Sequence, residues 1–228
     1  MKKALIILSC VVVAVLAFAT AFLLAYDNVQ GMTEKPVLYV YSPQEQLVTV
    51  SVDVDGAIDT AYPAPDALET TDRGTQASWT VTASPDGTLT DRSGRTYPSL
   101  FWDGPVGQKS PDEGFVVARE DAVPFLEEKL ALLGLTDKEA ADFITYWAPR
   151  IRANEYTFVS FDASSYTAHA RYSFTDEAGA PVEPDTFIRV FMTIRQAEAT
   201  TQVREQAFGP TPQRTGLVAV EWGGTEGQ

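Results

Sequence analysis

Two carboxylates stand beside tryptophans in this chain. Asp103 follows Trp102 in the stretch YPSLFWDG, and Glu221 precedes Trp222 in VEWGG near the end of the sequence. Glycoside hydrolysis uses two carboxylates roughly 5–9 Å apart, and an aromatic ring offers a flat face to a sugar. One hypothesis is therefore a catalytic pair of Asp103 and Glu221. A second is a binding surface that contains Trp102 and Trp222.

A third interpretation is structural, and we favour it. Both stretches end in glycine, as strand ends often do, and large aromatic side chains are mostly buried. Glu221 would alternate outward from Val220 and Trp222, so we expect it in solvent or paired with a nearby cation. Asp103 would accept backbone N–H bonds in the turn that follows it. Both tryptophans are then core residues.

The remaining polar candidates give weaker signals. His169 is the only histidine, and we expect it on the outward face of a strand, without the nucleophile that a general base needs. Asp53, Asp55 and Asp59 lack the spacing and the closing glutamate of a calcium loop. The chain has no P-loop, GxSxG, SxxK, HExxH or dinucleotide-binding motif. We therefore predict neither a metal site nor a cofactor, and lean against an enzyme.

Composition excludes some partners and indicates a compartment. The formal net charge is −14, with no basic stripe, which argues against nucleic-acid binding. The segment Ala4–Tyr26 carries no charge and is long enough to span a membrane, and Lys2 and Lys3 precede it. The positive-inside rule then places the rest of the chain outside the cell membrane. The alternative is a secreted protein, cleaved near Ala21.

The predicted organisation follows from that segment. Residues 1–26 form the anchor or signal sequence, residues 27–35 a linker, and residues 36–228 one extracytoplasmic domain. Cys10 is the only cysteine, so the domain has no disulfide.

The elements that must position the candidate residues are mainly strands. Period-two alternation predicts a half-buried strand that contains Val48, Val50, Val52 and Val54, and similar patterns predict strands over 166–174, 186–194 and 216–222. The signals of two helices lie between them. Asp121 is the expected N-cap of the first helix and Gly134 its C′ residue. Thr136 and Glu139 form a capping box for the second. Pro149 predicts a break at Ala148, and Trp147 is expected in the core.

These elements predict an α+β domain after an N-terminal transmembrane helix. Its main part is an antiparallel sheet or sandwich, with one αα-hairpin packed on it.

Several segments, in this order, resemble a family of uncharacterised bacterial envelope proteins that are membrane-anchored or secreted. They include KPVLYVYS, WTVTASPDGTL, YPSLFWDG, FLEEKLALLGLTDKEAADFITYW and VEWGG. The resemblance spans most of residues 35–225 and implies one contiguous domain, but it brings no catalytic residues. The chain departs from the pattern at Ser42, where the family would have proline.

Three functions remain open at this point. The leading one is a non-enzymatic module that binds an envelope protein or a glycan. The alternatives are a glycoside hydrolase that uses Asp103 and Glu221, and a structural subunit of the envelope.

Overall fold

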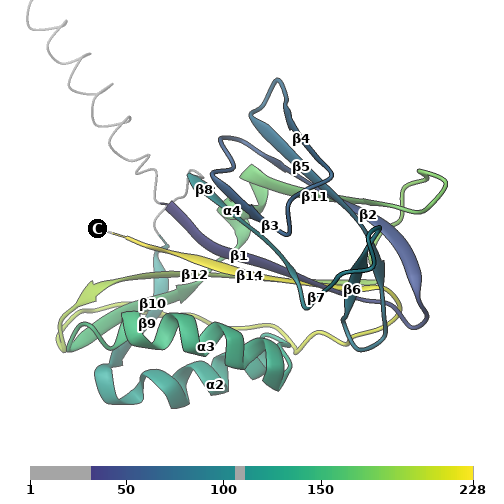
Figure 1. Ribbon diagram of the computed structural model, residues 1–228. Helices are drawn as coiled ribbons and strands as arrows, with labels where there is room; N and C mark the ends of the chain where they lie inside the picture. The colour runs from purple at the N-terminus through teal and green to yellow at the C-terminus, as the bar shows by residue number, and fades with distance from the viewer. Residues whose placement is uncertain (1–31, 106–110, 228) are drawn as a thin grey trace, which may run out of the picture.

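The structure is a computed structural model that describes residues 32–105 and 111–227, and its strands form two sheets (Figure 1). The larger sheet has the order β13-β9-β10-β12-β14-β1-β8-β3. Its strands are β1 (Met32–Tyr41), β3 (Thr60–Tyr62), β8 (Leu100–Pro105), β9 (Glu113–Ala118), β10 (Tyr156–Phe161), β12 (Thr186–Ala197), β13 (Arg204–Glu205) and β14 (Val218–Glu226).

The smaller sheet has the order β11-β2-β5-β6-β7, with β4 paired to β5. Its strands are β2 (Gln46–Val54), β4 (Ala67–Thr70), β5 (Thr75–Ala83), β6 (Leu89–Asp91), β7 (Thr96–Tyr97) and β11 (Ala170–Thr175). The helices are the 3-10 turn η1 (Arg119–Asp121), α2 (Ala122–Leu132), α3 (Asp137–Ile151) and α4 (Ser164–His169).

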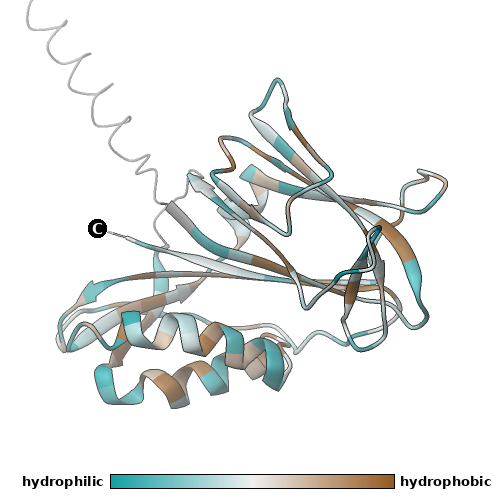
Figure 2. Cartoon of the chain, in the orientation of Figure 1, coloured by the Kyte–Doolittle hydropathy of each residue, from teal (hydrophilic) through white to brown (hydrophobic). Residues whose placement is uncertain are grey.

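The larger sheet is the central layer, and both of its faces are covered (Figure 1). Apolar and hydrophilic residues alternate along α2 and α3 (Figure 2), and the apolar side of each helix packs on this sheet. The smaller sheet packs on the opposite face. Val37 and Tyr39 of β1 accordingly enter the core under the helices, while Leu38 and Val40 enter the core between the sheets. Because both faces of the sheet are covered, β14 is buried at every residue except Glu226.

The predicted fold class is wrong. Strands make up 46% of the structure and helices 19%, so the protein is mainly β. The larger sheet is mixed rather than antiparallel, because β14 runs parallel to β12. Strands that follow each other in the chain commonly pair antiparallel. Here residues 198–217 return to the end of the sheet where β12 begins, so β14 runs parallel to β12. The expected antiparallel sheet or sandwich is instead a mixed sheet packed on a smaller antiparallel one, and α2 and α3 cover only the mixed sheet.

Several element boundaries also differ from the predictions. The strand expected over 166–174 starts as a helix, because residues Ser164–His169 form α4. Helix α3 continues through Pro149 to Ile151, where burial of Ala148 and Ile151 outweighs the missing backbone donor. Asp121 makes no side-chain capping bond.

The described part of the chain begins with β1, earlier than predicted. Strand β1 begins at Met32 rather than at Pro36, so it takes up part of the expected linker. The predicted anchor at Ala4–Tyr26 lies outside the described residues. Within residues 32–105 and 111–227, no helix is long and apolar enough to cross a membrane.

Candidate ligand-binding site

The two tryptophan–carboxylate stretches lie on strands that flank β1 on opposite sides. Trp102 of β8 and Glu221 of β14 point into the core between the sheets, where Glu221 lies opposite Leu38. Trp222 points to the other face, under α3. Because side chains alternate along a strand, Asp103 faces away from Trp102 and therefore away from Glu221. The two carboxylates lie on opposite faces of one sheet and cannot flank one glycosidic bond.

Glu221 pairs with a cation, which was one of its two predicted alternatives, but it does so in the core, so the predicted exposure to solvent is wrong. Its side chain is 1% exposed. It accepts a hydrogen bond from the Tyr166 hydroxyl at 2.6 Å and one from Arg189 Nε at 2.6 Å. Arg189 also donates to the carbonyl of Ala170 and stacks over Tyr166. Glu221 does point to the opposite face of β14 from Trp222, as the alternation predicts. The smaller sheet covers that face, which was expected to meet water.

Burial sets the titration of this cluster. It raises the pKa values of Tyr166 and Tyr172 well above their usual range, and the charge of Glu221 raises them further. Burial disfavours the charged form of Arg189, but the charge of Glu221 outweighs it and the pKa of Arg189 rises. Trp102 donates to the Tyr172 hydroxyl at 2.8 Å. The cluster is a satisfied internal network that joins the two sheets.

Residues 106–110, which follow β8, lie outside the described residues, so the turn-capping role predicted for Asp103 stays a prediction. Its backbone carbonyl accepts from the Asp59 amide at 2.8 Å, but its buried Oδ1 has no hydrogen-bond partner in the described part of the chain. The strand simply continues through this residue to Pro105, paired with Thr60.

The acidic residues near the end of β2 are held by arginines. Arg171 bridges Asp53 at 3.2 Å and Asp55 at 2.5 Å, and Asp55 also contacts Arg73 and His169. The hydrogen bond from Arg171 holds the pKa of Asp55 well below its usual range. Within the described ranges, no group of three or more His, Cys, Asp or Glu side chains is placed to hold a metal ion.

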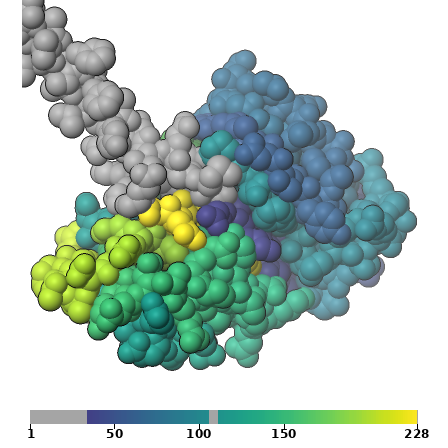
Figure 3. Space-filling view, turned by 60° about the vertical axis from the view of Figure 1, so that its left-hand side comes forward, coloured from purple at the N-terminus to yellow at the C-terminus, as the bar shows by residue number. Residues whose placement is uncertain are grey.

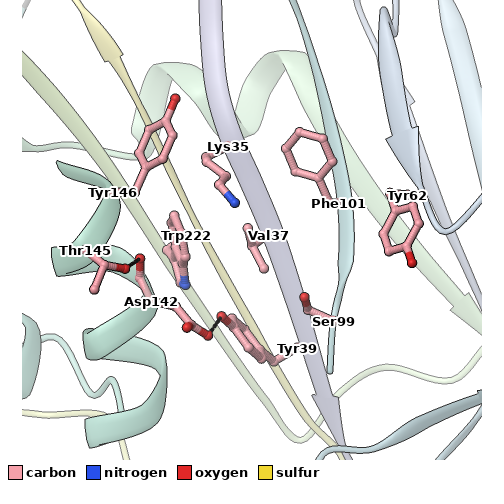
Figure 4. Close-up of a pocket in the computed structure, with 10 residues that line it drawn as sticks. All are labelled: Lys35, Val37, Tyr39, Tyr62, Ser99, Phe101, Asp142, Thr145, Tyr146 and Trp222. Carbon is pink, nitrogen blue, oxygen red and sulfur yellow. Dashed lines mark hydrogen bonds between the residues drawn. The ribbon is translucent and has the colours of Figure 1, made fainter. Parts of the chain in front are cut away.

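A cavity of about 500 Å³ opens on the helix-covered face of the larger sheet, beside Trp222 (Figure 4). Aromatic rings dominate its wall, and a few polar groups converge on it, as is typical of small-molecule sites. We call it the Lys35 pocket. Its lining residues are Lys35, Val37, Tyr39, Tyr62, Ser99, Phe101, Asp142, Thr145, Tyr146 and Trp222.

Lys35 is the one lining residue whose backbone has left-handed geometry. Its φ is +57°, and it is the only non-glycine residue with positive φ among those described. The register of β1 shifts between Glu34 and Val37 against β14 and between Thr33 and Val37 against β8, so the backbone bulges there. Bulges and left-handed non-glycine residues concentrate at functional sites, because they aim a side chain at some conformational cost.

The bulge aims the ammonium of Lys35 between two rings. Lys35 Nζ lies 5.6 Å from the centroid of Phe101 and 5.5 Å from that of Tyr146. No carboxylate in the described chain lies within salt-bridge distance of it. A cation held only by aromatic faces remains able to pair with a ligand.

Tyr146 of α3 forms one side of the pocket and is held there by Glu34 and Arg150. Its hydroxyl donates to Glu34 at 2.7 Å, and the guanidinium of Arg150 lies 3.7 Å from its ring centroid. Arg150 in turn pairs with Glu34 and Glu226. Burial, followed by the bond to Glu34, raises the pKa of Tyr146 to about 12. This corner lies where the start of β1 meets the end of β14, side by side at the surface in Figure 3.

The floor of the pocket is polar. Tyr39 donates to Asp142 of α3 at 2.8 Å, and Figure 4 shows the indole nitrogen of Trp222 turned toward the same pair. The Trp222 Nε1–H has no hydrogen-bond partner among the described residues that meets standard geometry. Burial and the neighbouring Asp142 raise the pKa of Tyr39 far above its usual range, so its hydroxyl stays a donor.

A second contact holds α3 against β1. Buried Glu139 completes the capping box with Thr136 and also accepts from Tyr41 at 2.7 Å and twice from Arg214 at 2.8 Å. Burial alone would raise the pKa of Glu139, but the bonds from Arg214 and its other donors lower it. The wall of the pocket that α3 provides is therefore fixed in place.

The sequence located one of these residues and missed the rest. Of the two predicted binding tryptophans, Trp222 lines the pocket and Trp102 does not. Phe101, in the same stretch YPSLFWDG, lines the pocket from the face of β8 opposite to Trp102. A lysine directly before a proline gives no warning of positive φ, so no signal in the sequence pointed to Lys35.

The chemistry available here is recognition rather than metal binding. Among the described residues, Asp142 is the only carboxylate that lines the pocket, which is too few for a metal cage. Comparison of the chain with protein-family models, with curated proteins and with solved structures finds no match.

Proposed function

We propose that this protein is a non-enzymatic binding module whose ligand is a glycan, and that the Lys35 pocket holds one of its sugar rings. The observation that carries the proposal is the strained Lys35 with its ammonium between Phe101 and Tyr146, at the mouth of an aromatic cavity.

The wall and floor suit a sugar better than an apolar ligand. Phe101 and Tyr62 offer ring faces, while Asp142, Thr145 and Ser99 offer oxygens that accept hydroxyl protons. A sugar ring presents C–H groups on its faces and hydroxyls on its edge, so it fits this division. Catalysis by Asp103 and Glu221 gains no support, because these carboxylates lie on opposite faces of the sheet.

The setting of the module comes from the sequence. If Ala4–Tyr26 anchors the chain, as its length and the preceding lysines suggest, the pocket lies on the outside of the cell. The glycans within reach are then those of the envelope itself or of its surroundings.

A glycan array probed with the purified full-length chain tests this proposal. We expect binding to a defined group of oligosaccharides, and a loss of at least about tenfold in affinity for Phe101→Ala. Phe208→Ala is the matched control, because Phe208 is also a half-buried phenylalanine in the helix-side core but does not line the pocket. Absence of binding to any glycan, or equal losses for both variants, would contradict the proposal.

A further inference from the structure

A second cavity, of about 520 Å³, lies on the other side of Tyr62. It is formed by the β3–β4 connection and by β5, β6 and β7 of the smaller sheet. Tyr62 lines both cavities, and its side chain is one of the few large apolar ones left exposed, at 55%. Its ring meets Tyr97 edge-on at 5.7 Å, so it stands between the two cavities as a supported platform.

Two arginines that are exposed to solvent line the second cavity. Arg92 and Arg95 line it, and neither forms a salt bridge with a carboxylate in the described chain. Arg95 instead lies over the ring of Tyr97, with 5.4 Å between its guanidinium carbon and the centroid. The formal net charge of the chain is −14, yet this cavity contains two guanidinium groups without a salt-bridge partner in the described chain.

The carboxylates of the second cavity already have partners. Asp91 accepts from the backbone amides of Ser93 and Arg95 and from the hydroxyls of Ser93 and Tyr97. Asp66 accepts from the backbone amide of Thr80 at 2.7 Å. Both aspartates keep their charge, but within the described residues neither forms a salt bridge with Arg92 or Arg95, so these guanidinium groups can pair with an anion from outside.

We infer that the two cavities are subsites of one extended site, and that its ligand is an acidic glycan. A sugar ring occupies the Lys35 pocket, the chain crosses Tyr62, and the carboxylate of a further sugar pairs with Arg92 and Arg95. Guanidinium groups bind carboxylates through two parallel hydrogen bonds, which gives this subsite its selectivity. The inference rests on the proposed function, since it assigns the charge of the glycan proposed above.

The test uses the full-length chain and oligogalacturonate, with the same oligosaccharide after reduction of its carboxylates to alcohols. Calorimetry should show at least about tenfold tighter binding of the carboxylated form, since charge-assisted hydrogen bonds account for this much or more. Arg92→Gln with Arg95→Gln should remove that preference and leave affinity for the reduced form unchanged. Lys138→Gln with Arg152→Gln is the matched control, because it removes two exposed charges outside both cavities.

The outcomes separate the two claims. Equal affinity for the two forms, with a loss for Phe101→Ala, overturns the acidic subsite and retains the glycan site. Equal losses for the arginine variant and its control also overturn the subsite, because the effect is then one of net charge. If free galacturonate monomer binds as tightly as the oligosaccharide, the extended site is overturned. If neither form binds, the proposed function fails for this class of glycan, and the inference fails with it.

Discussion

Lys35 shows how a single residue can combine strain with exposure to a ligand. A left-handed backbone costs a residue with a Cβ about 1–2 kcal/mol, and glycine avoids that cost. The lysine is retained at φ +57° with its ammonium between two rings, where each cation–π contact contributes about 0.5–1 kcal/mol. The contacts offset the strain, and the cation remains accessible at the pocket.

This balance predicts an unusual order of stability. Lys35→Gly should be more stable than Lys35→Ala by about 0.5–1 kcal/mol, because the relief of left-handed strain exceeds the extra chain entropy of glycine. Urea unfolding measures the difference. At Gln196, an exposed residue of β12 with ordinary φ, the order should be the reverse. Alanine more stable than glycine at both positions would show that Lys35 is unstrained.

Glu221 predicts a large loss of stability from a small change. Glu221→Gln leaves Arg189 charged and unpaired in the core, and breaking one side of a buried pair costs about 3–5 kcal/mol. If Glu221 were exposed, Glu221→Gln would leave the free energy of unfolding nearly unchanged. Replacement of both partners, by Arg189→Met with Glu221→Leu, should recover most of the loss. Thermal unfolding of the single and double variants decides, and a stable single variant would refute the buried network.

At the scale of elements, the end of β2 is tied to β11 through one aspartate. The pKa of Asp55 is depressed in the folded state, chiefly by Arg171, so the folded form binds its proton more weakly than the unfolded form. Its contribution to stability is therefore present above the unfolded pKa near 4 and is lost as pH falls through the lower, folded value.

Acid unfolding tests this tie. Asp55→Asn should lower stability at pH 7 and flatten the decline of stability below about pH 5, because the titrating group is gone. Asp59→Asn is the control, since Asp59 is exposed and forms no salt bridge in the described chain. Parallel acid-unfolding curves for the wild type and Asp55→Asn would mean that the arginine contacts contribute nothing.

The elements also show what the sequence could predict. The valines of β2 are buried as predicted, Thr136 and Glu139 form their capping box, and Gly134 ends α2 with φ +92°. These features depend on neighbours within a few residues. The orientation of Glu221 and the bulge at Lys35 depend on layers and strands that pack from elsewhere in the chain, so no local pattern carries them.

At the scale of the molecule, the layered arrangement separates two tasks. The core between the sheets contains Trp79, Trp102 and the satisfied Glu221 network, and it serves stability. The helix-side core contains Trp222, and the Lys35 pocket opens beside it where α3 leaves part of β1 and β8 uncovered. The proposed glycan site would begin at the Lys35 pocket on this face and continue past β3 to the cavity on the smaller sheet.

The orientation of the whole chain is also testable. If Ala4–Tyr26 anchors the protein with its N-terminus in the cytoplasm, protease added to intact cells should degrade the domain. A cytoplasmic protein is the control for cell integrity. A domain that is cut only after lysis would contradict the proposed location, although not the pocket itself.

The most direct test of the central claim is the response of the four tryptophan indole N–H signals of the full-length chain in an NMR titration. Trp222→Phe assigns the signal at the pocket. On addition of an oligosaccharide that binds, the Trp222 signal should shift in proportion to occupancy, while that of Trp102 stays fixed, because Trp102 lies in the other core and lines neither cavity. Saturating binding that leaves Trp222 unmoved would contradict the assignment of the Lys35 pocket as the glycan site.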